Sequence, residues 1–365
     1  MDRLIYKFFP PPRYLRMPAF GIDISDRSMK YVELVESSGH LEVENFGEKI
    51  LPPGVIKAGE IKDKDTLASI LKEVFEKHAS RGVVLSLPEE KAFVDVVTMP
   101  AMPSENLREA LELQLEEHIP LNARQAIFDF EIIPHSGDSN NLDLVVVAFP
   151  KALVEDYRDV VRQAGLIPIS FEMEAHALVR SALPKSEREP VMVVDFGRTR
   201  TSFIIVSEGV VRFTSTVTVA GAALDEVLQR IFKISPEEAE RIKNEKGLVR
   251  TEENKEVFDA LLPTISAIRD EISRHLIFWK EHAKNVNFPD PSVRKIYLCG
   301  GDSNLYGFKE YLSYELKLPI IMSNPWVNVV DFNDYIPEIT YRNSLSYATA
   351  LGLALAAIKT ERSYD

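Results

Sequence analysis

Two aspartates, Asp23 and Asp195, hold the same position in a pattern that occurs twice in the chain, at residues 20–34 and 192–206. Each copy has an apolar strand that ends in the aspartate, a turn of small and polar residues, and a second apolar strand. Such a turn directs backbone N–H groups toward an anion, and its aspartate can hold a cation through water. Either copy alone is typical of an ordinary hairpin, because Asp and Gly are common turn residues. The repetition, together with the third turn below, indicates a duplicated fold that binds a Mg²⁺-polyphosphate.

A third turn with suitable chemistry follows the apolar segment 295–299, where Gly300 and Gly301 precede small polar residues and a predicted helix. Paired glycines allow the backbone to come close to a flat ligand, because no Cβ stands in the way. Upstream of this turn, Glu240 and Lys243 lie three residues apart on one face of a predicted helix. Without the surrounding turns, such a pair would be interpreted as a surface ion pair.

Composition narrows the class of protein. The length of 365 residues allows two or more cores, and the net charge of −13 argues against a general nucleic-acid binder. The one cysteine, Cys299, excludes an intramolecular disulfide and fits a reducing compartment, and its apolar neighbours predict an inert core thiol. No apolar run approaches the roughly 20 residues that a membrane span needs, and the seven histidines show no metal-ligand spacing. We therefore expect a cytoplasmic protein without a zinc site.

The first 17 residues differ from the rest. They are apolar and basic with a charge of +3, and Pro10, Pro11 and Pro12 stop any helix. Lys7 interrupts the short apolar stretch and no small-residue cleavage site follows, which argues against a signal peptide. Two interpretations stay open: a segment that touches a membrane surface or a partner, and a tail that packs on the body or is disordered.

Apolar periodicity predicts the elements of the first half. We expect strands near 18–25, 29–36, 41–49, 82–87 and 92–98 and a helix near 65–79. A compact α+β unit should follow, with a helix from Ser104 to about Ile119, strands near 127–134 and 142–149, and a helix near 151–164. A further helix is predicted over 170–182.

The second half begins at Val191 with three predicted strands, the third over 210–219, and then a helix that opens at Gly221. The sequence Ser-Pro-Glu-Glu at 235–238 is a capping box that predicts a helix start. A long helix should run over about 252–283 with an interruption near Pro263. The last predicted helix, 343–359, is short of a membrane span and is expected to be a buried core helix.

This order of elements resembles the actin-like ATPase superfamily from about residue 18 to 359. Within it, the sequence is most similar to the PilM family of type IV pilus assembly proteins, and the division protein FtsA resembles it next. The resemblance is carried by GIDIS at 21–25, VLSLP at 84–88, MPAM at 99–102, EEHIP at 116–120, AGAAL at 220–224, EEAE at 237–240, and the stretch from Gly300-Gly301 to Asn324-Pro325.

The resemblance implies an α/β protein with the actin-like ATPase fold, a duplicated ribonuclease H-like architecture. Two lobes would surround a nucleotide cleft, and a small α+β subdomain would be inserted. The expected domains are a tail at 1–17, the start of the first lobe at 18–85, the inserted subdomain at 86–168, a connecting helix at 169–190 that closes the first lobe, the second lobe at 191–359 with a helical subdomain near 222–290, and a tail at 360–365.

The resemblance also implies ATP and Mg²⁺ as ligands. Asp23 and Asp195 would hold Mg²⁺, mainly through water. The nucleotide would be bound by Asp23, Ser25, Asp195, Gly197, Thr199, Gly221, Glu240, Lys243, Gly300, Gly301 and Ser303. Glu172 matches a position where relatives carry a residue that orients the attacking water, although Glu174 and His176 are close in sequence and the choice among the three stays open.

The chain departs from the family pattern at several positions. Ser25 replaces a glycine of the first turn, where its hydroxyl would donate to phosphate instead. Arg198 and Arg200 are bulky for a phosphate turn, and would either clamp phosphate or point to solvent. Asp302 would repel phosphate if it faced the ligand. These departures argue against hydrolysis more than against the fold.

The function implied by the resemblance is that of an ATP-binding component of the type IV pilus inner-membrane assembly platform, at the cytoplasmic face of the inner membrane. It would bind the cytoplasmic N-terminal tail of a PilN-like bitopic membrane protein in a groove formed with the inserted subdomain, and would contact other pilus assembly proteins. ATP would be a structural or switching ligand with at most slow turnover. Self-association and peripheral membrane contact stay open.

Three alternatives remain at this point. A small-molecule kinase on the same fold would need a catalytic base and a substrate pocket, which nothing in 86–168 indicates. An FtsA-like membrane-tethered filament would need a C-terminal membrane helix, whereas residues 360–365 are short and polar. A scaffold that kept the fold but lost the nucleotide is consistent with the changes at Ser25 and Arg198.

Overall fold

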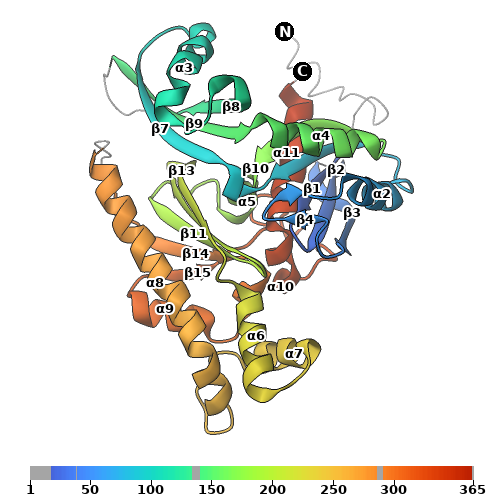
Figure 1. Ribbon diagram of the computed structural model, residues 1–365, viewed down its shortest axis with the longest axis vertical. Helices are drawn as coiled ribbons and strands as arrows, with labels where there is room; N and C mark the ends of the chain where they lie inside the picture. Colours follow the sequence, from blue (N-terminus) through green and yellow to red (C-terminus); the bar gives the residue numbers. More distant parts are fainter. Residues whose placement is uncertain (1–17, 38, 134–139, 286–290, 364–365) are drawn as a thin grey trace. The chain divides into compact units, whose positions relative to one another are not determined.

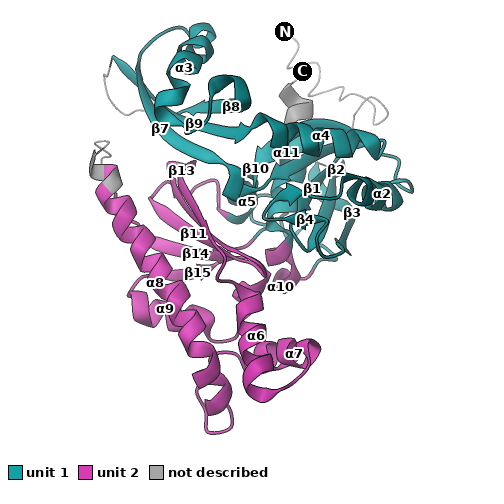
Figure 2. Cartoon of the chain, viewed as in Figure 1, with its two compact units in different colours: residues 1–182, 325–339, 347–365 teal, residues 183–324, 340–346 magenta. Residues whose placement is uncertain are grey.

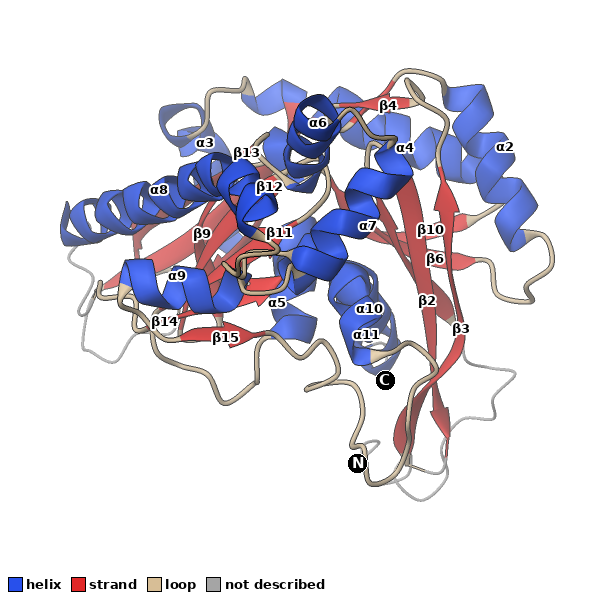
Figure 3. Ribbon diagram, turned by 90° about the horizontal axis from the view of Figure 1, so that it is seen from below, coloured by secondary structure: helices blue, strands red, loops and turns tan. Residues whose placement is uncertain are grey.

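The computed structural model describes residues 18–37, 39–133, 140–285 and 291–363. These residues form two compact units, each of which combines strands with helices (Figures 2 and 3). Unit 1 comprises residues 1–182, 325–339 and 347–365, and unit 2 comprises residues 183–324 and 340–346. The prediction for the first 17 residues lies outside the described residues. Within the described part of the chain, no helix has the length and apolar character needed to cross a membrane.

Unit 1 is built on a five-stranded sheet with the order β10-β6-β1-β2-β3 (Figure 1). Its strands are β1 (Ala19–Ile24), β2 (Ser28–Ser37), β3 (His40–Ile50), β6 (Gly82–Leu87) and β10 (Ile167–Met173). Strands β1, β2 and β3 are antiparallel, whereas β6 and β10 run parallel to β1. The unit also contains the short strand pair β4 (Ile56–Lys57) and β5 (Glu60–Ile61). Its helices are α2 (Lys64–Phe75), α4 (Lys151–Gln163), α5 (Glu174–Ala182) and α11 (Ala348–Ser363). It has the 3₁₀ turn η2 (Glu89–Lys91), and the 3₁₀ turn η5 (Leu345–Tyr347) includes residues of both units.

Unit 2 repeats this topology, with the strand order β13-β12-β11-β14-β15. Its strands are β11 (Val191–Phe196), β12 (Thr201–Ser207), β13 (Val210–Val217), β14 (Lys295–Cys299) and β15 (Ile320–Met322). The first three are again antiparallel, and the last two again run parallel to the first. Its helices are α6 (Gly221–Phe232), α7 (Pro236–Lys246), α8 (Lys255–Asn285), α9 (Phe308–Leu316) and α10 (Tyr341–Ser344), with the 3₁₀ turn η4 (Gly301–Asn304). The duplication predicted from the two aspartate segments is confirmed.

The inserted subdomain has a sheet of its own, with the order β7-β9-β8. It consists of β7 (Phe93–Pro100), α3 (Ser104–His118), the 3₁₀ turn η3 (Ala123–Gln125), β8 (Ala126–Ile132) and β9 (Asn141–Pro150). The stripe of Leu107, Leu111 and Leu115 on α3 packs into one core with the strands, as the period of the helix predicts.

Helix α4 differs from its predicted place in the inserted subdomain. The sequence groups 151–164 with that subdomain, whereas α4 packs against α2 and β10 of the main sheet. The Asp156 carboxylate accepts from Lys64 at 2.5 Å, and the buried Tyr157 hydroxyl donates to the Gly59 carbonyl at 3.0 Å. Apolar spacing marks a helix face but not the sheet that the face meets.

Helix α11 belongs to unit 1, although the sequence places it in the second lobe. It packs against β1, β2, β6 and α5, and Figure 1 shows it in red beside the blue strands. Two glycines allow this close approach. A Cβ on Gly21 of β1 would lie 2.3 Å from the Ala350 carbonyl oxygen, and one on Gly352 would lie 1.7 Å from the Ala177 carbonyl oxygen.

Two further expectations about secondary structure are wrong. Residues 167–173 form strand β10, so that the helix predicted over 170–182 begins only at Glu174. Helix α8 is continuous through Pro263, which is exposed, so water can solvate the carbonyl that the proline leaves without a donor. Buried side chains on both sides of the proline, including Leu261 and Ile265, hold the helix on one core.

Replacing Gly352 with alanine should destabilise the fold. In an exposed helix, Gly→Ala stabilises by about 1 kcal/mol, whereas here the methyl group would overlap the Ala177 backbone and should cost about 2–3 kcal/mol. Urea unfolding measures the difference. The control, Gly54→Ala, has open space around its Cβ and a φ of +90°, and should cost only about 1–2 kcal/mol. A Gly352→Ala variant more stable than the parent would contradict the close packing of α11.

Candidate functional site

The two aspartate turns have the same backbone geometry. Asp23 pairs with Lys30 across the first hairpin, and Asp195 pairs with Ser202 across the second, so the aspartate and its partner are seven residues apart in both. The Ser25 N–H donates to the Ser28 carbonyl at 2.9 Å, and the Gly197 N–H donates to the Arg200 carbonyl at 3.1 Å. Both turns therefore close with the same hydrogen bond, although serine replaces glycine in the first.

The first turn uses its polar groups internally. The Ser25 hydroxyl donates to the Ser28 carbonyl at 2.9 Å, so its proton is engaged in the turn and not directed to a ligand. One carboxylate oxygen of Asp23 accepts from the fully buried Ser86 hydroxyl at 2.8 Å. Ser86 thereby orients Asp23, a role that the sequence analysis missed because the two residues are 63 positions apart. The phosphate and Mg²⁺ roles of Ser25 and Asp23 stay predictions.

The second turn rests on the start of α6. The Gly221 N–H donates to the Gly197 carbonyl at 3.0 Å, and the Ala222 N–H donates to the Arg198 carbonyl at 2.8 Å. A helix start usually offers its first N–H groups to capping groups, water or an anion. Here the first two of them hold the turn in place.

Gly300 brings the third turn against Asp195. Its φ is +87°, and a Cβ there would lie 2.5 Å from the Asp195 carboxylate and from the Phe196 carbonyl oxygen. Strand β14 pairs Cys299 with Asp195, and the thiol is buried as the sequence predicts. Burial and the nearby Asp195 charge raise the pKa of Cys299 strongly, which keeps it an inert thiol.

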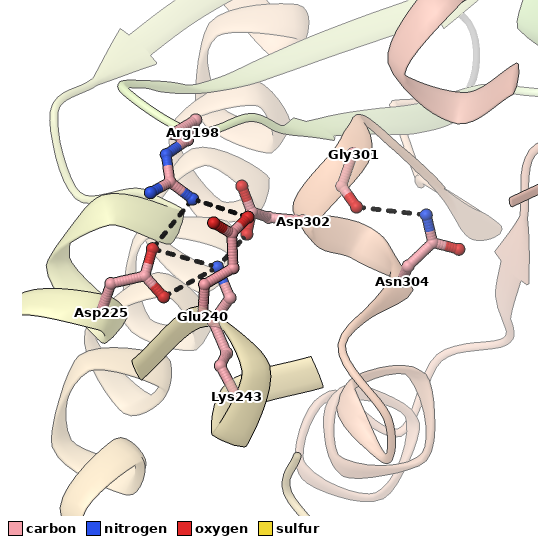
Figure 4. Close-up of polar contacts among 7 residues, drawn as sticks. All are labelled: Arg198, Asp225, Glu240, Lys243, Gly301, Asp302 and Asn304. Atoms are coloured by element: carbon pink, nitrogen blue, oxygen red, sulfur yellow. Dashed lines mark hydrogen bonds and ion pairs between the residues drawn. The ribbon is translucent and has the colours of Figure 1, made fainter. Parts of the chain in front are cut away.

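A buried ammonium group joins three segments of unit 2 (Figure 4). The Lys243 side chain on α7 is only 2% exposed, and its Nζ lies 3.1 Å from the Asp225 carboxylate on α6 and 2.5 Å from the Asp302 carboxylate on η4. The helix start predicted for α7 is confirmed, because the Ser235 hydroxyl accepts from the Glu238 N–H. Lys243 is thus a structural contact in this arrangement, and its predicted contact with ribose or base stays a prediction.

Asp302 does not oppose an anion in the way the sequence suggests. Its carboxylate is paired with Lys243, and a Cβ on Gly221 would lie 2.2 Å from it. A carboxylate at the start of a helix is stabilised by the helix dipole. Gly221 is therefore the residue that admits Asp302 beside α6.

The rest of the third turn is fixed by its own hydrogen bonds. The buried Ser303 hydroxyl donates to the Cys299 carbonyl, and the Asn304 amide donates to the Gly301 and Arg342 carbonyls. The Ser303 hydroxyl is engaged in the turn, and its predicted contact with adenosine stays a prediction.

Arg198 and Glu240 form the more exposed part of the cluster. The Arg198 guanidinium lies 2.9 Å from the Asp225 carboxylate and 3.3 Å from that of Glu240. The Arg198 and Glu240 side chains are 35% and 51% exposed, whereas that of Asp225 is 3% exposed. Arg198 therefore does not simply point to solvent, and the sequence missed Asp225, which carries no motif.

Glu172 lies on β10, not on a helix, and its carboxylate forms an ion pair with Arg180 at 2.7 Å. Arg180 also donates to the Gly352 carbonyl, so the pair links β10, α5 and α11 within unit 1. His176 lies nearby on α5. The water-orienting role of Glu172 stays a prediction.

The structure brings nine of the predicted residues together in unit 2: Asp195, Gly197, Thr199, Gly221, Glu240, Lys243, Gly300, Gly301 and Ser303. Asp23, Ser25 and Glu172 belong to unit 1. The described residues contain no cluster of three or more His, Cys, Asp or Glu side chains placed to hold a metal.

Replacing Lys243 with methionine should destabilise the protein by about 3 kcal/mol, because it leaves the buried Asp225 and Asp302 carboxylates with too little positive charge. Thermal and urea unfolding measure the loss. Lys246→Met, at an exposed position of the same helix, is the matched control and should cost less than about 0.5 kcal/mol. Equal stability of the two variants would show that the cluster is not structural.

His176 should make stability depend on pH. Burial, and secondarily the charge of Arg180, lowers the pKa of His176 to about 4. The unfolded chain protonates this residue below about pH 6.5, so between pH 6.5 and 4 the folded state binds fewer protons. The free energy of unfolding should therefore fall by up to about 3 kcal/mol as pH falls through this window.

Urea unfolding of the parent and of His176→Gln at pH 7.5 and 4.5 tests this dependence. The variant should lose less stability than the parent, because glutamine does not titrate. His40→Gln, on the β2–β3 hairpin, controls for the loss of a histidine. Parallel pH profiles for the parent and His176→Gln would contradict the low pKa of His176.

Comparison with known proteins supports the actin-like fold that the sequence predicts. The family model described as type IV pilus assembly protein PilM matches residues 21–358. Among solved structures, the PilM–PilN type IV pilus biogenesis complex is similar with a TM-score of 0.78 and 25% identity, over 94% of this chain and 99% of that chain.

Two more distant structures are similar in fold alone. Ethanolamine utilization protein EutJ from Carboxydothermus hydrogenoformans has a TM-score of 0.53 and 20% identity, over 95% of this chain and 90% of that chain. MreB5 of Spiroplasma citri bound to ADP has a TM-score of 0.56 and 14% identity, over 96% and 98%. The predicted actin-like fold is confirmed, and the chain belongs to the PilM family of type IV pilus assembly proteins.

Proposed function

We propose that the protein is the ATP-binding cytoplasmic component of the type IV pilus inner-membrane assembly platform and that it binds the N-terminal cytoplasmic tail of a PilN-like membrane protein. The observation that carries this proposal is the similarity over nearly the whole chain to the PilM–PilN complex, together with the family match.

The arrangement of unit 2 supports nucleotide binding. Two turns of the kind that approach a polyphosphate or nucleoside meet around the start of α6, and Gly300 places its backbone beside Asp195. Asp195 supplies a carboxylate suited to a hydrated Mg²⁺, as Asp23 does in the other copy of the turn. When bound, Mg²⁺·ATP would bring its own charge and phosphate oxygens to these turns.

The inserted subdomain supports tail binding. Strand β7 places Val94 and Val96 on the face opposite α3, and the register of the sheet sets Val147 of β9 beside Val94. These valines are half-buried, whereas Asp129 and Glu131 on β8, at the edge of the same sheet, are exposed. Cytoplasmic segments next to a membrane span are enriched in Lys and Arg. An apolar and basic tail would pack on the valines and pair with the carboxylates.

ATP would act as a switching ligand with at most slow turnover. A ligand shifts a conformational equilibrium only by its different affinities for the two states. Binding of the tail should therefore be compared with and without nucleotide.

The nucleotide part is tested by incubating the protein with labelled Mg·ATP and identifying the retained nucleotide by chromatography. The parent should retain nucleotide, and Asp195→Ala should retain at least about tenfold less, because the ion loses a carboxylate at the turn. Asp259→Ala, at an exposed site on α8, is the control and should match the parent. Retained ATP would indicate a switch, ADP would indicate a cycle, and no retention by the parent would refute nucleotide binding.

The partner part is tested by fluorescence anisotropy with a labelled peptide of the PilN-like N-terminal tail. Val96→Asp should weaken binding at least about tenfold, because it places a charge within the apolar row. Leu113→Asp, on the exposed side of α3, is the matched control and should bind like the parent. Failure of the parent to bind the peptide, with or without nucleotide, would refute this part of the proposal.

A further inference from the structure

Arg198 is one of two arginines of the second turn whose chemistry the family resemblance does not explain. It lies three residues after Asp195, and its backbone carbonyl accepts from the Ala222 N–H, so its Cα is held against α6. Its guanidinium reaches over to carboxylates on both α6 and α7, as Figure 4 shows.

The start of α6 has few backbone N–H groups left for an anion. The first two N–H groups of α6, those of Gly221 and Ala222, already donate to carbonyls of the turn, and the Ala223 N–H donates to the Ala220 carbonyl. The start of the helix therefore has less to offer an anion than a free helix start would have. Lys243 is buried and held between two carboxylates, which leaves the half-exposed Arg198 as the nearest cation of the cluster.

The cluster keeps a cation when Arg198 is released. The buried Asp225 carboxylate has a second cation, Lys243 at 3.1 Å, which it shares with Asp302. The other partner, Glu240, is 51% exposed at 3.3 Å, and an exposed ion pair of this kind contributes little to stability.

We propose that Arg198 binds a phosphate group of the nucleotide and that Glu240 competes with the nucleotide for this arginine. The inference rests on the nucleotide part of the proposed function and deepens it. Arg198 leaves Glu240 and donates N–H groups to phosphate oxygens, a pairing that its planar fork makes with two hydrogen bonds. Glu240 then acts against binding, whereas the family resemblance makes it a contact for ribose or base.

The two variants Arg198→Gln and Glu240→Gln should change affinity in opposite directions. Calorimetric titration with Mg·ATP should show binding about tenfold to 100-fold weaker for Arg198→Gln, because a charge-assisted pair is lost. It should show binding about threefold tighter for Glu240→Gln, because the exposed ion pair no longer competes. A purely structural ion pair would make both variants weaker together, so the opposite sign distinguishes the two roles.

Arg241→Gln is the matched control, since Arg241 lies on α7 and pairs only with exposed carboxylates of the same helix among the contacts described. It should leave ATP affinity unchanged, and thermal unfolding should show all three variants folded. Arg198→Gln that binds like the control, or Glu240→Gln that binds more weakly than the parent, would overturn the inference while nucleotide binding by the parent stands. A parent that binds no nucleotide would overturn both, and the peptide measurement would be unaffected.

Discussion

The pairing of one buried ammonium group with two carboxylates is the contact on which this part of unit 2 depends. Lys243 lies between Asp225 and Asp302, so α6, α7 and η4 meet at a single charge. Removing a charge from water is costly, and the cost is recovered only when the partners are close and well oriented. The three segments are therefore restricted to arrangements that keep this cluster together. The arrangement admits Asp302 only because Gly221 has no side chain, which ties the start of α6 to the third turn.

The two copies of the aspartate turn show which features a duplication preserves. Hairpin register, turn length and the closing hydrogen bond are the same, because strand pairing dictates them. The contacts that hold each turn in place differ between the two copies. The second turn rests on α6, whereas the first is followed by Asp26, whose carboxylate accepts from the N–H groups of Ala58 and Gly59 in a loop. The chain thus keeps the backbone of the turn and changes what surrounds it.

The sequence predicts the parts of the structure that local patterns determine. The strand at 295–299, the start of α7 and the three turns are found where the spacing of apolar, polar and glycine residues places them. Strand β10 was missed because Pro168 and Glu172 interrupt its apolar pattern. The small residues of α11 fit a close contact with any element, so the sequence does not show that this helix packs on unit 1. The charged cluster joins residues at 225, 243 and 302, and no local pattern encodes a contact between residues so far apart.

Arg198 and Asp302, two departures from the family pattern, have to be interpreted together. Taken singly, an arginine crowds a phosphate turn and an aspartate repels the ligand. In the structure, Asp302 is paired with Lys243, Lys243 is shared with Asp225, and Asp225 is also paired with Arg198. The aspartate that appeared to oppose binding is thus held by a lysine, and it is linked to the arginine through that lysine and Asp225. The charge of a residue beside a phosphate turn therefore says little about its effect until its own partner is known.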